Sequence, residues 1–235
     1  VAERRNCIIR PPLANLDQLI FIVSTCDPAP NYLLLDKFIA IAEYKEIKPV
    51  VAVTKTDLGS SSEIIDIYGS IGIEVIEIDY SDQSTIEAVK NILAGKISAF
   101  TGNSGAGKST LLNAVDPTLD IPTAEISKKL GRGRHTTRHA ELYKLETGGY
   151  IADTPGFSTF ETNRYDIIRK EELAGCFREM AEFTDQCRFK DCSHTCEKGC
   201  AVLEALGEGR IHTSRHTSYC TMYDEAKQLK EWELK

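Results

Sequence analysis

Residues 102–109 have the pattern Gly-x4-Gly-Lys-Ser, which is typical of a phosphate-binding loop. The apolar run Ile97 to Thr101 predicts a buried strand before this loop, and Thr110 to Ala114 predict the first turns of a helix after it. Backbone N–H groups at such a helix start bind phosphate, and the Ser109 hydroxyl would bind magnesium. The predicted nucleotide-binding residues here are Gly102, Asn103, Ser104, Gly105, Ala106, Gly107, Lys108, Ser109 and Thr110.

A second candidate phosphate element is Asp153-Thr154-Pro155-Gly156, at the end of another predicted strand. An aspartate in this position can hold magnesium through water, and the N–H of the following glycine can bind a γ-phosphate. The pattern Asp-x-x-Gly alone is common in turns, but it becomes specific when a phosphate loop precedes it. We therefore expect Asp153 and Gly156 to contact the nucleotide.

Thr54-Lys55-Thr56-Asp57 follows the predicted strand Pro49 to Val53 and is the candidate element for reading the base. The carboxylate of Asp57 can accept hydrogen bonds from N1–H and the exocyclic amine of guanine, a pair of donors that adenine lacks. The methylene groups of Lys55 can lie along the purine face. Thr54 stands where asparagine is usual, and Ser81, which follows the next strand, is a second base contact by position alone.

Four cysteines and a histidine lie close together near the C-terminal end of the sequence. In a reducing compartment such a cluster favours a metal site over disulfides. Three thiolates and one imidazole, or four thiolates with Cys196 in place of His194, would form a closed tetrahedral zinc site with a structural role. The predicted ligands of the first set are Cys187, Cys192, His194 and Cys200.

Short apolar runs alternate with helical patterns in the first two thirds of the chain, which predicts a mostly parallel sheet covered by helices. The later part changes to helices around the cysteines, predicted at Glu171 to Phe183 and Ser214 to Trp232. The other expected strands are Leu19–Val23, Pro49–Val53, Val75–Ile78, Ala140–Leu145 and Gly149–Ala152, and the other expected helices are Tyr32–Tyr44, Glu63–Ser70 and Thr85–Ala94.

The order of these elements is unusual, because an ordinary GTPase has the phosphate loop first and the base-reading Lys-x-Asp last. Here Lys55 and Asp57 precede Gly102. A circular permutation explains this order, and folds whose termini lie close together tolerate it. We therefore predict an α/β P-loop GTPase fold with a circularly permuted sheet, followed by a small helical zinc-binding domain.

The chain resembles the circularly permuted, ribosome small-subunit-dependent GTPase family known as RsgA. The resemblance runs over nearly the whole chain and includes Arg10 to Gln18, Thr54 to Asp57, Gly102 to Thr110, Leu130 to Thr137, Asp153 to Phe157 and the cysteine cluster. It implies that residues 1–18 are a linker from a missing N-terminal OB-fold. The change of pattern near Phe160 to Tyr165 predicts 19–162 as the GTPase domain and 163–235 as the zinc-binding domain. The family pattern favours His194 over Cys196 as zinc ligand.

The resemblance also implies roles in catalysis. Phe157 replaces the glutamine that orients water in many GTPases, and the family assigns that role to the histidine before the paired threonines, which is His135 here. Thr137 would complete the magnesium shell. The same segment, Ser127 to His139, is densely basic, which favours contact with ribosomal RNA in a chain of net charge −7.

We therefore expect a cytoplasmic, monomeric GTP hydrolase that binds GTP and GDP and is stimulated by the small ribosomal subunit and its rRNA. No apolar run is long enough for a membrane span, and 42% hydrophobic residues are ordinary for a globular protein. Two alternatives remain open from the residues. One is a P-loop kinase for a small molecule, and the other is a zinc-bearing RNA-binding module that uses GTP as a structural ligand.

Overall fold

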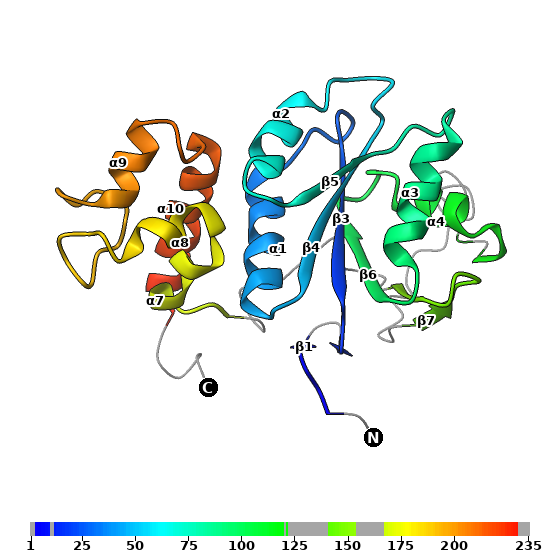
Figure 1. Ribbon diagram of the computed structural model, residues 1–235, viewed down its shortest axis with the longest axis horizontal. Helices are drawn as coiled ribbons and strands as arrows, with labels where there is room; N and C mark the ends of the chain where they lie inside the picture. The colour runs from blue at the N-terminus through cyan, green and yellow to red at the C-terminus, as the bar shows by residue number, and fades with distance from the viewer. Residues whose placement is uncertain (1–2, 10–11, 120, 122–140, 154–166, 230–235) are drawn as a thin grey trace. The chain divides into compact units, whose positions relative to one another are not determined.

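The computed structural model describes residues 3–9, 12–119, 121, 141–153 and 167–229, and of Glu141 and Asp153 only the backbone. The chain forms two compact units. The first, called the sheet unit, comprises residues 1–30 and 47–161, and the second, called the helical unit, comprises residues 31–46 and 162–235 (Figure 1). None of the helices in the described ranges is both long enough and apolar enough to cross a membrane.

The sheet unit is built on six strands in the order β5-β4-β3-β6-β8-β7, in which only β7 and β8 are antiparallel to each other (Figure 1). The central strand β3 is buried at every residue, as expected for an apolar strand with a neighbour on each side. The strands are β3 (Gln18–Ser24), β4 (Lys48–Thr54), β5 (Glu74–Glu77), β6 (Ile97–Gly102), β7 (Glu141–Lys144) and β8 (Tyr150–Asp153).

The carboxyl ends of β4, β3 and β6 meet at one edge of the sheet. Ser24 pairs with Thr54, and Ile22 pairs with Gly102. From β3 the chain proceeds outward through β4 to β5 and then returns to the other side of β3 with β6. The strand order therefore reverses between β3 and β6, and ligands of open α/β sheets bind at such a switch point.

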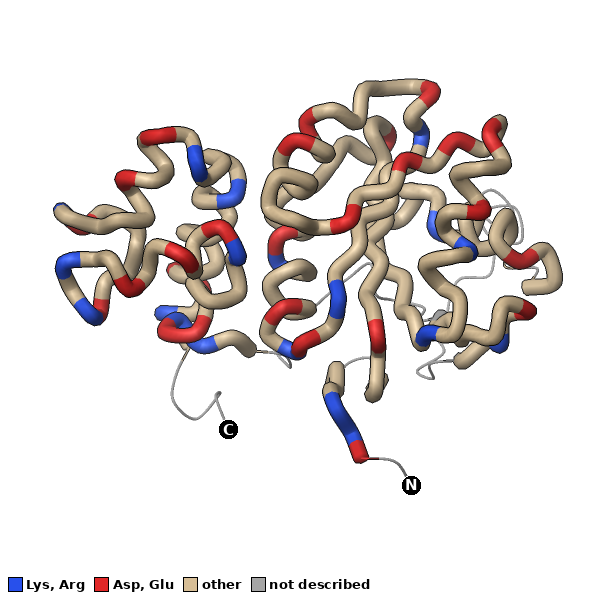
Figure 2. Tube along the Cα trace, in the orientation of Figure 1, with Lys and Arg blue, Asp and Glu red and all other residues tan. Residues whose placement is uncertain are grey.

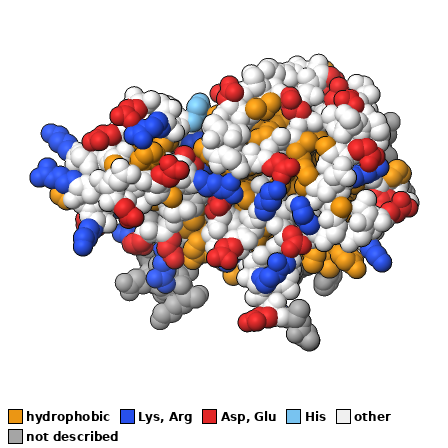
Figure 3. Space-filling view, viewed as in Figure 1, with side chains coloured by type: hydrophobic (Ala, Val, Ile, Leu, Met, Phe, Trp, Pro, Cys, Tyr) orange, Lys and Arg blue, Asp and Glu red, His pale blue; other side chains and the backbone are white. Residues whose placement is uncertain are grey.

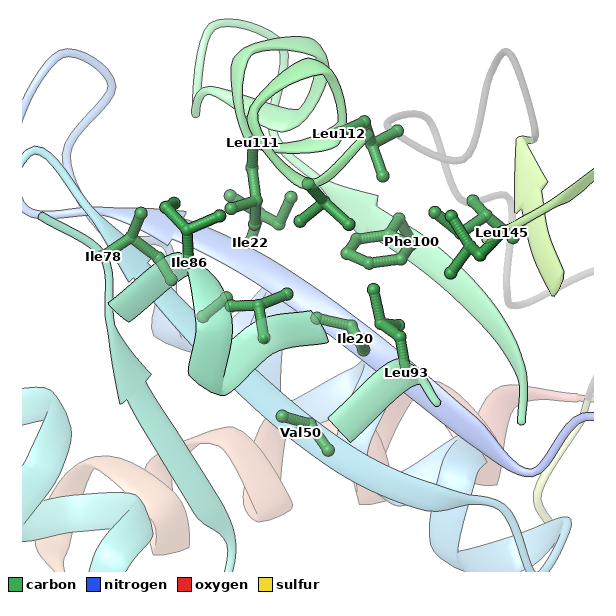
Figure 4. Close-up of a cluster of buried hydrophobic side chains, with 14 of the residues drawn as sticks. Ile20, Ile22, Val50, Ile78, Ile86, Leu93, Phe100, Leu111, Leu112 and Leu145 are labelled. Carbon is green, nitrogen blue, oxygen red and sulfur yellow. The ribbon is translucent and has the colours of Figure 1, made fainter. Parts of the chain in front are cut away.

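Helices α3 (Gln83–Leu93) and α4 (Lys108–Val115) pack on one face of this sheet. The apolar residues of α3 recur at helical spacing, and Asp82 caps the helix start by accepting from the Ser84 N–H at 2.9 Å. Figure 4 shows Leu111 above Ile22, Ile86 beside Ile78, and Phe100 near Leu112 and Leu145, all within one cluster of buried side chains. This packing fixes the start of α4 against the end of β6, where the phosphate loop lies.

Five short elements also belong to the described part of the sheet unit. The expected helix from Glu63 to Ser70 is present as α2 (Ser62–Ile64) continued by a π-helical turn (Ile65–Gly69), and a 3-10 turn (Pro117–Leu119) follows α4. The expected linker contains β1 (Cys7–Ile8) and β2 (Leu13–Ala14), which pair in antiparallel orientation.

Asp17 attaches this N-terminal hairpin to the sheet. Its carboxylate accepts from the Ile97 N–H at 2.8 Å and from the Arg5 guanidinium at 2.8 Å. Burial alone would raise the pKa of Asp17, but these two donors outweigh it and hold the pKa below its ordinary value. Asp17 thus bonds both to the start of β6 and to Arg5, which precedes the hairpin.

The helical unit contains α1 (Tyr32–Tyr44), α7 (Lys170–Leu173), a 3-10 turn (Ala174–Cys176), α8 (Arg178–Thr184), α9 (Ala201–Gly207) and α10 (Thr213–Gln228). The sequence predicts one helix from Glu171 to Phe183, but the structure has three short turns of helix there. Phe177 interrupts them with extended backbone (φ −113°, ψ 99°) and is fully buried against Tyr219, with the rings edge to face at 5.4 Å. The free energy gained by burying the Phe177 ring exceeds the free energy that an uninterrupted helix would gain.

Helix α1 belongs to the helical unit, although the sequence places it between two strands of the sheet. Arg215 of α10 is buried and donates to Asp36 of α1 at 2.6 Å and to Glu179 of α8 at 2.7 Å. Burial disfavours the charged guanidinium, but the two carboxylates outweigh it and raise the pKa of Arg215. Lys37 and Glu225 form a second ion pair between α1 and α10.

Acidic and basic residues lie along the trace of both units (Figure 2).

Candidate nucleotide site and metal centre

The phosphate loop between β6 and α4 depends on glycines at defined positions. Gly102 has φ 151°, and a Cβ atom added there would lie 2.3 Å from the carbonyl oxygen of Ile22 on β3. Gly107, which precedes the first residue of α4, has φ 95° in the left-handed region. Larger residues rarely adopt either conformation, so the glycines allow the loop to turn sharply into the helix start. The first N–H groups of a helix have no partner within the helix and form a site for anions.

Thr54 at the end of β4 holds the phosphate loop in place. Its side chain is buried, and its hydroxyl donates to the carbonyl oxygen of Ala106 at 2.6 Å. The two residues are 52 positions apart in the sequence. The sequence predicted Thr54 as a nucleotide-binding residue, and the structure places its hydroxyl on the loop backbone.

The predicted base-reading residues Lys55 and Asp57 lie on the turn that follows Thr54. Lys55 has φ 58°, its ammonium group donates to the carbonyl oxygen of Asp27, and its own carbonyl oxygen accepts from the Thr25 hydroxyl at 2.6 Å. Asp57 is exposed at the same sheet edge as the phosphate loop. A carboxylate in this position is accessible to a ligand whose phosphates bind at Gly102 to Ser109.

Ser81 lies on the loop that follows β5. The Thr56 hydroxyl donates to the carbonyl oxygen of Ile78 at 3.1 Å, which connects the two loops. Ser81 donates to the Asp79 carboxylate through its hydroxyl at 2.6 Å and its N–H at 2.8 Å. These bonds from Ser81 lower the pKa of Asp79, because they stabilise the ionised carboxylate.

Several predicted site residues lie outside the described part of the chain. They are His135, Thr137 and Gly156, together with the basic segment Ser127 to His139. The backbone of Asp153 is the end of β8, which pairs with β6 at Ala152 and Ala99. Asp153 therefore follows a strand adjacent to the one that leads into the phosphate loop.

The structure brings Cys187, Cys192, His194 and Cys200 together, with their ligand atoms all within 4.8 Å of one another. The Sγ atoms of Cys187 and Cys200 are 3.8 Å apart, and each lies 3.5 Å from Nδ1 of His194. Bond lengths of about 2.3 Å to sulfur and about 2.0 Å to nitrogen give tetrahedral edges of about 3.8 Å and about 3.5 Å. These residues therefore fit a tetrahedral metal ion. Cys196 is exposed and lies outside the group.

Side chains around the cluster hold the loop that carries His194. The Glu197 carboxylate accepts from the N–H groups of Ser193 at 2.8 Å and Cys196 at 3.2 Å, and also from the Ser193 hydroxyl. Burial alone would raise the pKa of Glu197, but these hydrogen bonds outweigh it and lower the pKa to about 2. Nε2 of His216 lies 2.8 Å from the carbonyl oxygen of His194. Such contacts orient metal ligands.

Sequence reasoning missed several of these residues. Thr25 and Asp27 follow the central strand. Residues after the carboxyl end of a parallel strand often lie at a ligand site, and this position was the signal that could have identified them. Glu197 and His216 had no signal in the sequence, because an acid within a cysteine cluster and a lone histidine on a helix are common without such contacts. Only the folded chain brings His216 to the cluster and sets the Glu197 carboxylate against the backbone of its loop.

The sequence and structure both match known proteins. A family model described as RsgA GTPase matches residues 1–163. The small ribosomal subunit biogenesis GTPase RsgA of Caldanaerobacter subterraneus subsp. tengcongensis is 43% identical over 231 residues, which are 97% of this chain and 77% of the relative. The protein of the same name from a Geobacillus species is 42% identical, over 98% of this chain and 79% of the relative.

Two solved structures are similar over almost all of the chain. YjeQ from Thermotoga maritima has a TM-score of 0.81 and 35% identity, covering 98% of this chain and 78% of YjeQ. YloQ, described as a circularly permuted GTPase, has a TM-score of 0.77 and 33% identity, covering 97% of this chain and 74% of YloQ. These likenesses confirm the predicted permuted GTPase fold and the resemblance stated from the sequence. The chain belongs to the RsgA GTPase family.

Proposed function

We propose that this protein is a GTP hydrolase that acts in late maturation of the small ribosomal subunit and is stimulated by binding that subunit. The observation that carries the proposal is the hydrogen bond from Thr54 to Ala106, 2.6 Å long, which joins the base-reading turn to the phosphate loop. The chain thereby holds a guanine-selective carboxylate and a phosphate site at one sheet edge. The name of its relatives supports the small ribosomal subunit as the partner.

In this proposal GTP lies across the switch point of the sheet. The backbone of the phosphate loop and Lys108 hold the phosphates, while Asp57, with Lys55 and Ser81 beside it, reads the guanine. His135 orients the water that attacks the γ-phosphorus, and GDP leaves with the β-phosphate oxygen. Gly156 donates its N–H to the γ-phosphate.

Ser109 and Thr137 would bind a magnesium ion directly, with Asp153 holding it through water. The ion, when bound with GTP, neutralises charge that develops on the phosphate oxygens.

Zinc is the metal we propose for the cluster, bound by Cys187, Cys192, His194 and Cys200. Three sulfurs and one imidazole nitrogen suit zinc, and four protein ligands occupy every position of the tetrahedron. The ion would stabilise the loop between Cys187 and Cys200, which has no regular secondary structure between α8 and α9.

We propose a monomer that works in the cytoplasm, where small subunits are assembled. The basic segment from Ser127 to His139 is a contact with ribosomal RNA in this proposal, because it concentrates positive charge in a chain of net charge −7. Since the same segment carries His135, binding of the subunit would position the water-orienting histidine.

The test is turnover of GTP and ATP by the full chain, with and without purified small subunits. We expect GTP to be preferred and the subunits to raise its turnover. His135→Ala should retain GTP binding and lose the stimulated turnover. Preference for ATP would indicate a small-molecule kinase instead. Flat turnover in all conditions, with GTP still bound, would indicate an RNA-binding module that uses GTP as a structural ligand.

A further inference from the structure

An aromatic side chain is exposed in the loop that connects the first two cysteines of the metal cluster. Phe189 has 46% of its surface exposed, and it is the one large hydrophobic residue left exposed among the described residues of the helical unit. Its neighbours Arg188 and Lys190 are exposed as well. We call residues 188–191 the Phe189 tip. The proposed nucleotide chemistry uses none of these residues.

The backbone of the Phe189 tip is fixed at both ends. Cys187 and Cys192 flank it, and both are members of the metal cluster. The Arg188 N–H donates to the carbonyl oxygen of Gly199 at 3.0 Å, and a Cβ added to Gly199 would lie 3.2 Å from Cβ of Arg188. The backbone at Arg188 and the backbone at Gly199 are therefore in close contact, and a side chain at position 199 would crowd Arg188. An exposed ring on a fixed backbone loses little conformational entropy when it binds a partner.

Three basic residues lie beside the ring in the sequence or next to the glycine that contacts the tip. Arg188 and Lys190 flank it, and Lys198 precedes the glycine that contacts the tip; none of the three forms an ion pair with any residue that the structure describes. The Arg188 guanidinium lies 5.4 Å from the centre of the Phe189 ring. Asp191 and Asp185 are the exposed acids of this segment. On the face drawn in Figure 3, basic and acidic side chains are interspersed, so attraction of a polyanion must come from local groups such as these.

We propose that the Phe189 ring stacks on an unpaired RNA base while Arg188, Lys190 and Lys198 contact the flanking phosphates. Unpaired bases stack on exposed aromatic rings, and adjacent cations neutralise their phosphates. A protein partner would call for a wider apolar patch than one ring among charges. The inference rests on the proposed function only in that the small ribosomal subunit supplies the RNA.

The experiment measures binding of the full chain, loaded with zinc, to a fluorescent single-stranded RNA of mixed sequence. Phe189→Leu keeps an apolar side chain without a stacking face and should bind about tenfold more weakly. Tyr150→Leu, at an exposed aromatic of β8, is the matched control and should bind like the wild type. Replacing Lys190 or Lys198 by Gln should each reduce the slope of log affinity against log salt by about 0.7.

A second measurement reports stacking directly. Because Trp232 is the one tryptophan of the sequence, F189W in a W232F background places the sole tryptophan at the tip. Its fluorescence should be quenched by RNA with affinity retained. Equal RNA affinity of wild type and F189L, or no quenching of F189W, would overturn the inference. Loss of affinity for intact subunits without loss for protein-free rRNA would also overturn it, in favour of a ribosomal protein as partner.

These outcomes are separate from the test of the proposed function. F189L should retain subunit-independent GTP turnover, because the tip lies outside the nucleotide site. If small subunits fail to stimulate the wild type, the proposed function is wrong, and the RNA titration still decides the role of Phe189.

Discussion

The phosphate loop of the sheet unit and the metal cluster of the helical unit position their functional groups by different means. The loop is shaped by backbone conformation, with Gly102 at φ 151° and Gly107 at φ 95°. The cluster is assembled from side chains, and Glu197, Tyr219 and His216 hold the loop that carries His194 through hydrogen bonds to its backbone. One site depends on residues that must have no side chain, and the other depends on particular side chains.

This difference predicts which kind of substitution damages each site. Adding a single carbon atom at Gly102 should damage the phosphate loop more than removing one hydrogen bond from its edge. The metal cluster should tolerate neighbouring changes but fail when a ligand or its ion is removed. Three changes test this contrast and one tests the buried ion pairs of the helical unit, and they follow in order of decreasing expected effect.

Removing the proposed zinc ion should have the largest effect. A chelator that strips zinc should abolish cooperative unfolding of the helical unit, because zinc binding to short cysteine and histidine segments contributes about 10–16 kcal/mol. Cys200→Ser should have the same effect, seen by circular dichroism and by bound zinc per chain. Cys196→Ser is the matched control and should keep one zinc ion. If C196S loses the ion, Cys196 is a ligand.

Replacing Arg215 by Met should destabilise the helical unit by about 3–5 kcal/mol. The change leaves Asp36 and Glu179 buried beside each other without their shared cation. Urea denaturation followed at the helical unit measures the loss. Arg210→Met removes an exposed pair with Glu208 and should cost at most about 1 kcal/mol. Equal losses in the two variants would contradict the importance of the buried triad.

Gly102→Ala should cost the sheet unit about 3 kcal/mol through backbone strain and overlap with the carbonyl of Ile22. Nucleotide binding should fall in parallel, as measured by titration with a fluorescent GTP analogue. Gly69→Ala is the control, because its added Cβ would meet only Ile65 at 3.9 Å without a positive φ. An unaltered affinity in G102A would show that the loop does not need this conformation.

Thr54→Val should have the smallest effect, a loss of about tenfold in nucleotide affinity. Valine has the same shape but cannot donate to Ala106, and such a hydrogen bond contributes about 0.5–1.5 kcal/mol. Thr54→Ser retains the hydroxyl and should bind nearly as the wild type. Calorimetric titration with GDP and magnesium compares the three. If valine binds like threonine, Thr54 acts through packing alone.

The strands of the sheet unit and helix α1 of the helical unit are predictable because their signals are local. The helix from Tyr32 to Tyr44 was predicted with the bounds that the structure shows, and each expected strand is present within two residues at either end. Apolar runs and turn residues carry this information directly. The interruption at Phe177 was not predictable, since it depends on Tyr219, 42 residues later in the chain.

The candidate sites show the same division. The sequence predicted the group of Cys187, Cys192, His194 and Cys200, but left Cys196 open because spacing permits either set. The structure distinguishes the two ligand sets, because His194 lies in the group while Cys196 is exposed outside it. The roles of His135, Thr137 and Gly156 remain predictions.

The sequence by itself determined the phosphate loop, the cysteine cluster and the permuted order, because each is a pattern of residues close together in the chain. Only the tertiary structure decided that Thr54 bonds to Ala106, that α1 joins the helical unit through Asp36 and Arg215, and that Phe189 is exposed. The physical reason is that burial and hydrogen bonding between distant residues depend on which surfaces pack together. Local patterns specify which elements form, and packing specifies which side chains meet.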